Sequence, residues 1–91
     1  MKRALVTGGS GGIGAAICRR LAADGYFVYV HANRNAAKAE ALVAAIRADG
    51  GQAEALAFDV TDADASRAAL EALVADAPIQ VLVNNAGIHD D

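Results

Sequence analysis

Glycines crowd one short stretch near the amino end of the sequence. The run Thr7-Gly8-Gly9-Ser10-Gly11-Gly12-Ile13-Gly14 lies between an apolar segment, Ala4-Leu5-Val6, and a set of apolar residues at helical spacing. The amino end of a helix offers unpaired N–H groups and the positive end of the helix dipole, and both attract phosphate. Such a run can mark only a tight turn, but its place between a strand and a helix favours dinucleotide binding. The absence of a Gly-Lys-Ser/Thr sequence excludes a Walker-type phosphate loop.

A second group of polar residues follows the apolar segment at residues 26–31. Enzymes that bind NAD usually place an acidic residue here, about 20 residues past the glycines, to hold the adenosine ribose. This chain has Ala32 at that place, so no carboxylate would repel a 2′-phosphate, and the planar guanidinium of Arg34 can pair with one. Asn33 could donate to the same phosphate or to the ribose. We therefore predict NADP(H) as the cofactor rather than NAD; the alternative leaves Arg34 as a solvated loop charge.

The hydrophobic period switches repeatedly between strand-like runs and helical stripes. Strands are predicted at residues 4–7, 26–31, 53–59 and 79–83, and helices at residues 13–24, 35–48 and from a cap at Thr61 or Asp62 to a stop before Pro78. In the first helix the apolar face is predicted to hold Ile13, Ala16, Ile17 and Leu21. The β-α-β-α-β-α-β order predicts an α/β fold of the Rossmann type, a doubly wound parallel sheet with strand order 3-2-1-4. In that order, the strand at residues 79–83 is an open apolar edge, so we expect residues 1–91 alone to aggregate or to fold only partly.

Three motifs in this order resemble the short-chain dehydrogenase/reductase family. The first is the spacing Thr-Gly-x-x-x-Gly-x-Gly, which starts at Thr7 and ends at Gly14. The second is Asp59-Val60 at the end of the third strand, and the third is Asn84-Asn85-Ala86-Gly87 after the fourth. The resemblance covers the whole chain. Within the family, residues 81–88 and the segment Asn33-Arg34-Asn35 look most like 3-oxoacyl-(acyl carrier protein) reductases.

The resemblance implies roles for individual residues of a cofactor site. Asp59 would accept from the adenine amino group, or alternatively cap the turn that follows it. Asn85 and Ala86 would approach the ribose and nicotinamide, whereas Thr7 and Asn84 are expected to hold the strand ends. Ser10 would bond a phosphate or only its own turn. The predicted cofactor-binding residues are Gly8, Ser10, Gly11, Gly12, Ile13, Gly14, Asn33, Arg34, Asp59, Val60, Asn85, Ala86 and Gly87.

The family's catalytic Ser and Tyr-x-x-x-Lys lie beyond the Asn-Asn-Ala-Gly motif, and this sequence ends at Asp91. We therefore expect residues 1–91 to be the amino-terminal, NADP-binding half of a single Rossmann-fold domain, with no catalytic or metal-binding residue of its own. The resemblance implies a homotetramer that uses NADPH to reduce a 3-oxoacyl thioester carried on acyl carrier protein, in fatty-acid-type biosynthesis. The alternatives are a short-chain alcohol or sugar dehydrogenase that acts on another small ketone, or a non-catalytic dinucleotide-binding module.

The composition of the chain bears on which other kinds of protein it could be and on its cellular compartment. The formal net charge of −3 argues against a nucleic-acid surface, and no apolar run reaches the 18 residues of a membrane span. The single cysteine, Cys18, cannot form an internal disulfide, which suits a reducing cytoplasm. His31 lies at the end of a buried strand and is expected to be structural rather than catalytic.

Overall fold

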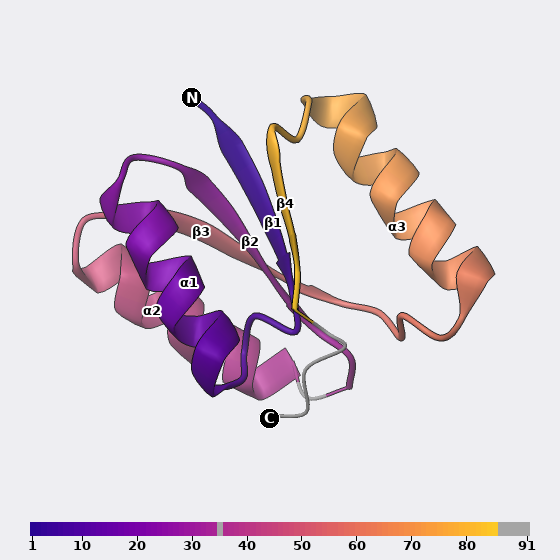
Figure 1. Cartoon of the computed structure of the whole chain (residues 1–91), viewed down its shortest axis with the longest axis horizontal. Coiled ribbons are helices and arrows are strands. Elements are labelled where there is room, and N and C mark those ends of the chain that lie inside the picture. The colour runs from indigo at the N-terminus through magenta and orange to yellow at the C-terminus, as the bar shows by residue number, and fades with distance from the viewer. Residues whose placement is uncertain (35, 86–91) are drawn as a thin grey trace.

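Strands and helices alternate strictly along the part of the chain that the structure describes, residues 1–34 and 36–85 of a computed structural model (Figure 1). The elements are β1 (Arg3–Thr7), α1 (Gly12–Ala23), β2 (Phe27–Ala32), α2 (Ala36–Ala48), β3 (Gln52–Ala57), α3 (Ala63–Asp76) and β4 (Val81–Asn84). This confirms the predicted α/β order. Gly25 and Gly50 follow the first two helices with φ of 94° and 89°, the left-handed conformation in which glycine commonly ends a helix.

The four strands form one parallel sheet in the order β3-β2-β1-β4, as predicted. Leu5 in the middle of β1 pairs with Tyr29 of β2 on one side and with Leu82 of β4 on the other. Because all strands run the same way, the loops that follow β1, β2, β3 and β4 emerge at one edge of the sheet. The polar residues singled out in the sequence stand at that edge.

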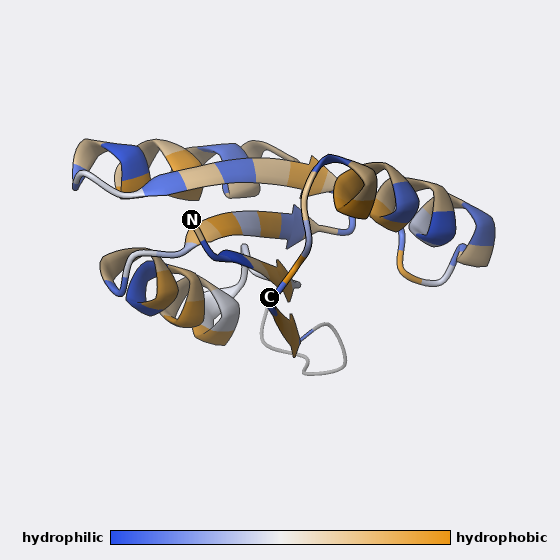
Figure 2. Cartoon of the chain, turned by 90° about the horizontal axis from the view of Figure 1, so that it is seen from above, coloured by the Kyte–Doolittle hydropathy of each residue, from blue (hydrophilic) through white to orange (hydrophobic). Residues whose placement is uncertain are grey.

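The hydrophobic core lies between the sheet and the two helices α1 and α2. Alternate residues of the central strands, Val6, Val28 and Val30, are fully buried on this face. They pack with Cys18 of α1 and with the apolar stripe of α2, which consists of Ala39, Leu42, Val43 and Ile46. Each helix carries both hydrophilic and hydrophobic residues along its length (Figure 2), as expected of helices with one face on a core.

The buried face of α1 differs from the predicted one. Gly14 and Cys18 are its buried residues, whereas Ile13 is 49% exposed and Ala16 is also exposed, so the prediction was wrong for these two. Ile17 and Leu21 do pack against the core, as predicted. The reason is close packing: α1 turns its smallest side chains toward the sheet and the preceding loop, which rotates Ile13 toward solvent.

The last helix, α3, stands apart from the other two (Figure 1). Asp62 caps it by accepting from the backbone N–H of Ala65 at 3.0 Å, which confirms one of the two predicted caps. No residue of α3 is buried, and Val74 is 53% exposed. Leu82 on β4 is 65% exposed, so within the described residues β4 is the open apolar edge that the sequence predicted. Among these residues, no helix has the length and apolar character needed to cross a membrane.

A matched pair of valine substitutions, one in the core and one on α3, tests whether the core is packed more tightly than the face of α3. Val30→Ala removes a fully buried side chain and is expected to lower the free energy of unfolding by about 2 kcal/mol, from lost burial and the cavity left behind. Val74→Ala makes the same change at an exposed site and is expected to cost about 0.5 kcal/mol or less. Urea unfolding of both variants measures the difference. Equal losses would show that the face of α3 is as well packed as the core.

Candidate functional site

The glycine loop between β1 and α1 forms a tight turn at Gly8. The φ of Gly8 is 64°, a left-handed conformation that side chains rarely adopt, and its carbonyl accepts from the backbone N–H of Gly11 at 3.3 Å. Helix α1 begins at Gly12 after an N-cap, Gly11, that has no side-chain cap, and no acidic residue occupies its first turn. The amino end of α1, where the helix dipole is positive, therefore has no acidic residue in its own first turn, which favours the binding of an anion.

Gly14 allows α1 to touch this turn. A Cβ atom at Gly14 would lie 2.3 Å from the carbonyl oxygen of Gly8, 2.7 Å from Nδ2 of Asn85 and 2.8 Å from Cα of Gly9. Two of these three neighbours are backbone atoms, which cannot move aside independently. A hydrogen atom is thus the only side chain that this contact accommodates.

Thr7 and the Asn84-Asn85 pair join the ends of β1 and β4. The hydroxyl of Thr7 lies 3.3 Å from the Val83 carbonyl and 3.1 Å from Oδ1 of Asn84, and it accepts from the Asn85 N–H at 3.0 Å. Thr7 and Asn84 therefore hold the strand ends, as predicted. Asn85 is 2% exposed and its Nδ2 donates to the Gly8 carbonyl at 3.1 Å, a loop-holding role that the sequence did not reveal. Its approach to ribose and nicotinamide stays a prediction.

His31 is fully buried at the end of β2, which confirms its structural character. Its Nδ1 accepts from the Gly8 N–H at 2.9 Å, and its Nε2 lies 2.7 Å from the Phe58 carbonyl. Burial lowers the pKa of His31 below its usual 6.5, and the bond to the Phe58 carbonyl opposes this shift only in part. A polar residue inside an otherwise apolar strand was the signal for this contact, but its partner could not be read from the sequence.

A surface pocket of about 340 Å³ opens beside the loop, where β2 and β3 end. It brings together four predicted residues that are far apart in the sequence, together with three others. Its lining consists of Ser10, Ala32, Asn33, Arg34, Lys38, Asp59 and Thr61. Lys38, which the sequence analysis missed, stands near the start of α2, where a helix normally favours an acidic side chain. That misplaced cation was the available signal.

The charged groups of this pocket are divided between its two sides. Arg34 and Lys38 bring positive charge from the α2 side. Oδ1 of Asp59 accepts from the hydroxyl of Thr61 at 2.7 Å and from its N–H at 2.9 Å. These two bonds, the hydroxyl first, hold the pKa of Asp59 below its usual range, with a smaller contribution from Arg34. Asp59 is thus an anion that stabilises the turn after it, which confirms the alternative role given to it; its contact with adenine stays a prediction.

The remaining predicted residues lie around this pocket or outside the description. Asn33 accepts from the Val60 N–H at 3.2 Å, so it links the ends of β2 and β3. Ala86 and Gly87 lie outside the described residues. Cys18 is buried beneath the loop, and burial raises its pKa to about 12, so its thiol is a packing group and not a nucleophile.

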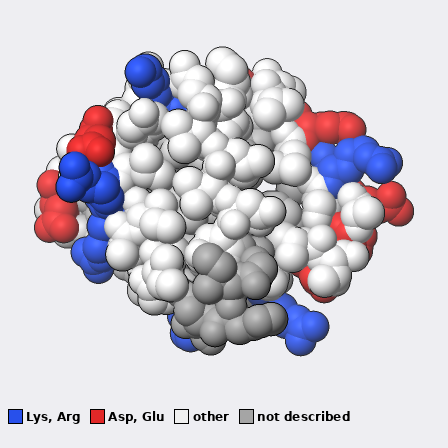
Figure 3. Space-filling view, viewed as in Figure 1, with Lys and Arg blue, Asp and Glu red and all other residues white. Residues whose placement is uncertain are grey.

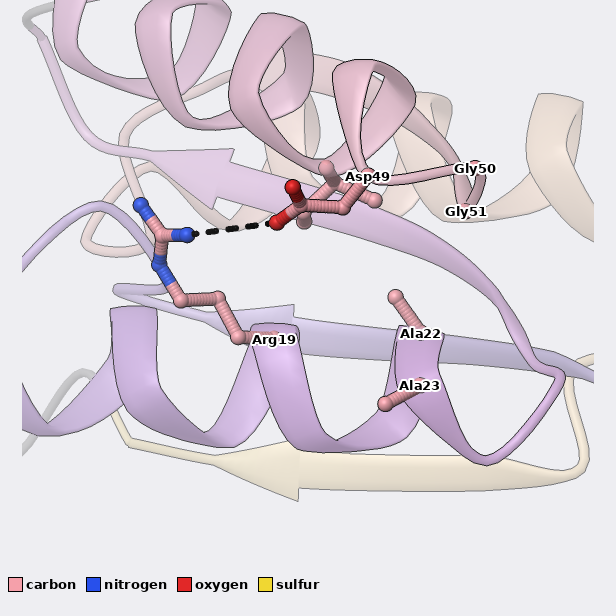
Figure 4. Close-up of a pocket in the computed structure, with 7 residues that line it drawn as sticks. Arg19, Ala22, Ala23, Asp49, Gly50 and Gly51 are labelled. Atoms are coloured by element: carbon pink, nitrogen blue, oxygen red, sulfur yellow. Dashed lines mark ion pairs between the residues drawn. The ribbon is translucent and has the colours of Figure 1, made fainter.

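A second pocket, of about 210 Å³, lies near the opposite edge of the sheet, between the carboxyl ends of α1 and α2 (Figure 4). Arg19 and Asp49 form an ion pair across it at 4.0 Å, and both side chains are exposed. This second pocket contains none of the predicted site residues.

Over the face seen in Figure 3, charged side chains gather at the two sides, where acidic and basic groups are interspersed. Among the described residues, no three His, Cys, Asp or Glu side chains form a cluster that could hold a metal ion.

Comparison with known proteins gives a consistent family. The family described as short chain dehydrogenase matches residues 2–91. A 3-oxoacyl-(acyl-carrier-protein) reductase FabG of Staphylococcus aureus is 45% identical over 91 residues, which are 99% of this chain and 37% of that protein. An uncharacterized oxidoreductase of Methylorubrum extorquens is 47% identical over 90 residues, 98% of this chain and 36% of that protein.

A solved structure shares the fold as well. A metagenomic short-chain oxidoreductase in complex with NADP superimposes with a TM-score of 0.85 at 44% identity, over 96% of this chain and 39% of that one. The chain therefore spans little more than a third of the length of the relatives it matches. The family match over nearly all of its residues, together with the parallel sheet and the glycine loop, shows that this chain belongs to the short-chain dehydrogenase family.

Proposed function

We propose that this chain binds NADP(H) as the cofactor-binding part of a short-chain oxidoreductase. The observation that carries the proposal is the pocket at the end of β2, where Arg34 and Lys38 supply two positive charges and Ala32 stands in place of an acid. A carboxylate at that place would bond the two ribose hydroxyls of NAD and repel a phosphate. An alanine leaves room for the 2′-phosphate of NADP beside the two cations.

The residues present fit the remainder of the dinucleotide. The pyrophosphate would lie over the glycine loop, against the amino end of α1, where Gly12 begins the helix and Ser10 lines the adjoining pocket. The adenine would lie toward Asp59, whose carboxylate accepts hydrogen bonds and carries the negative charge of the pocket. When bound, the nicotinamide supplies the hydride; this chain's residues bind it and orient it.

For the intact protein we propose reduction of a ketone, with a 3-oxoacyl thioester on acyl carrier protein as the favoured substrate. The likeness to the FabG reductase supports this class. A second candidate is a short-chain alcohol or sugar dehydrogenase, since oxidoreductases with other names share the fold at similar identity. A non-catalytic dinucleotide-binding module is the third. Steady-state assays of the intact protein with NADPH and either a 3-oxoacyl thioester or a simple ketone or sugar separate these candidates. We also propose a homotetramer, on the family resemblance alone, and a cytoplasmic location, on the single cysteine of the sequence.

Replacing Arg34 tests the cofactor choice. Arg34→Ala is expected to weaken NADPH binding about tenfold, because a charge-assisted contact to the 2′-phosphate is lost, and to leave NADH binding nearly unchanged. Lys38→Ala should shift the same ratio in the same direction. Arg67→Ala on α3 is the matched control, because Arg67 is an exposed arginine outside the pocket. Dissociation constants for both dinucleotides, measured by fluorescence titration, provide the comparison.

An equal loss of NADPH and NADH affinity in Arg34→Ala would contradict the assignment of Arg34 to the 2′-phosphate. A native preference for NADH would contradict the cofactor choice itself.

Replacing Gly14 tests the loop. Gly14→Ala would place a methyl group 2.3 Å from the Gly8 carbonyl, so the loop and α1 must separate, and binding of both dinucleotides should fall about a hundredfold or become undetectable. Gly51→Ala is the control, because its Cβ would also be crowded, at 2.8 Å from Cγ2 and 3.2 Å from the carbonyl oxygen of Ile46, but at a turn that lies outside the glycine loop and its adjoining pocket. It should lower thermal stability without changing affinity. A folded Gly14→Ala variant with unchanged affinity would show that the loop does not bind the cofactor.

A further inference from the structure

His31 touches both segments that form the proposed cofactor site. From the β1 side, the Gly8 N–H donates to Nδ1 of His31 at 2.9 Å. From the β3 side, the Phe58 carbonyl lies 2.7 Å from Nε2, and the Phe58 ring packs against the imidazole with centroids 4.2 Å apart. Phe58 is followed directly by Asp59, which lines the pocket. One buried ring therefore spans the distance between the glycine loop and the segment that carries Asp59.

These two contacts determine where the imidazole carries its hydrogen. A backbone N–H can only donate, so Nδ1 must be unprotonated to accept from Gly8. A carbonyl can only accept, so Nε2 must carry the hydrogen that it donates to Phe58. The neutral Nε2–H tautomer is thus the form that satisfies both partners. A second proton on Nδ1 would face the Gly8 N–H with another donor, and the loop would have to move away.

The contact acts at the point of the loop whose shape matters most. Gly8 has its left-handed φ of 64°, its N–H is bonded to His31, and its carbonyl accepts from Asn85. The next residue is held as well, because the Gly9 N–H donates to the His31 carbonyl at 2.8 Å. His31 therefore holds two consecutive residues of the loop, one through its ring and one through its backbone.

We propose that His31 is a positioning residue for the cofactor: its unprotonated Nδ1 holds the glycine loop in the shape that receives the pyrophosphate, so that dinucleotide affinity falls when this nitrogen is protonated. The inference rests on the proposed function, since it requires that the loop bind a dinucleotide. It adds a residue that touches neither phosphate nor nicotinamide and acts through Gly8.

The residues in contact with the His31 ring do not titrate, so the imidazole itself is the group that would take up a proton in acid. The segments in contact with it bring Gly8 from the loop and Phe58 from the end of β3, and neither titrates. Leu56, its partner in β3, does not titrate either. The next charged group along that segment is Asp59, whose Oδ1 is bonded to Thr61. Burial already lowers the pKa of His31 from 6.5, so the ring is neutral at pH 7 and gains its proton only as the pH falls below 6.5.

Two substitutions separate positioning from mere packing. His31→Asn places an amide oxygen at the distance of Nδ1 from the backbone, so it can accept from Gly8 but cannot titrate. His31→Leu fills part of the space and offers no acceptor. The intact protein and both variants are titrated with NADP⁺ and with NAD⁺ by calorimetry, from about pH 8 to about pH 5. NAD⁺ is included because it lacks the 2′-phosphate, whose own titration would otherwise contribute. Thermal unfolding of each variant identifies the pH range in which it is folded.

The expected pattern has three parts. His31→Leu binds both dinucleotides about tenfold more weakly at neutral pH, and by the same factor, because the loop and not the phosphate pocket is affected. His31→Asn recovers most of the wild-type affinity. The wild-type protein loses affinity for NAD⁺ as the pH falls below 6.5, whereas His31→Asn does not. His89→Asn, which removes the other histidine of this chain, retains the loss of affinity in acid.

Other results would overturn the inference. A folded His31→Leu variant that binds as tightly as wild type would show that the contact only stabilises the fold. The same acid dependence in wild type and His31→Asn would show that another group titrates. Both of these outcomes leave the proposed function intact, because the dinucleotides still bind. Failure of the wild-type protein to bind either dinucleotide would overturn the proposed function and this inference together.

Discussion

The close contact between Gly14 and the turn at Gly8 is the constraint on which the rest of the site depends. Because no side chain fits between them, α1 starts directly against the turn that follows β1, and its amino end adjoins the glycine loop. The Gly8 carbonyl is directed inward, where Asn85 donates to it, and the Gly8 N–H is directed to His31. The turn is therefore held by residues at the ends of other strands and also from α1, where Sγ of Cys18 lies 3.8 Å from the Gly9 carbonyl. The amino end of α1, with no acidic residue in its first turn, adjoins this loop.

The parallel sheet makes these long-range contacts possible. In an antiparallel sheet, the ends of neighbouring strands would lie at opposite edges, whereas here Thr7, His31 and Asn85 all stand at or just past the carboxyl ends of β1, β2 and β4. The strand order β3-β2-β1-β4 places β1 between β2 and β4, so the loop after β1 has partners on both sides. That is the position at which α/β sheets of this kind bind their ligands. Backbone hydrogen bonds of the parallel sheet set the spacing of the strands that hold the loop, and the core under α1 and α2 stabilises that sheet.

Much of this arrangement could be predicted from the sequence, because it depends on local pattern. Glycine spacing, apolar periodicity and turn residues are local signals, and they predicted the correct order of elements and of strands and limited the cap of α3 to Thr61 or Asp62, of which Asp62 is the cap. The failures came from contacts between distant segments. Ile13 and Ala16 follow a helical stripe, yet they are exposed because the contact of Gly14 rotates α1. Lys38 was also missed, although it stands in the first turn of α2 shortly after Arg34, because the sequence does not show that this turn lines the same pocket as the residues after β3.

Binding strength and cofactor choice depend on different parts of this site. In the proposed complex, the glycine loop would bind the pyrophosphate that NAD and NADP have in common, so its geometry would govern affinity for both. Arg34 and Lys38 would contact only the adenosine end, and because both side chains are exposed, solvent and salt weaken their attraction for an anion. A modest electrostatic contribution is sufficient there, because discrimination needs only a difference in free energy, and the absence of a carboxylate at residue 32 removes the opposing repulsion. In the proposed complex, selectivity could therefore change by substitution after β2 and in the first turn of α2 without disturbing the buried contacts that shape the loop.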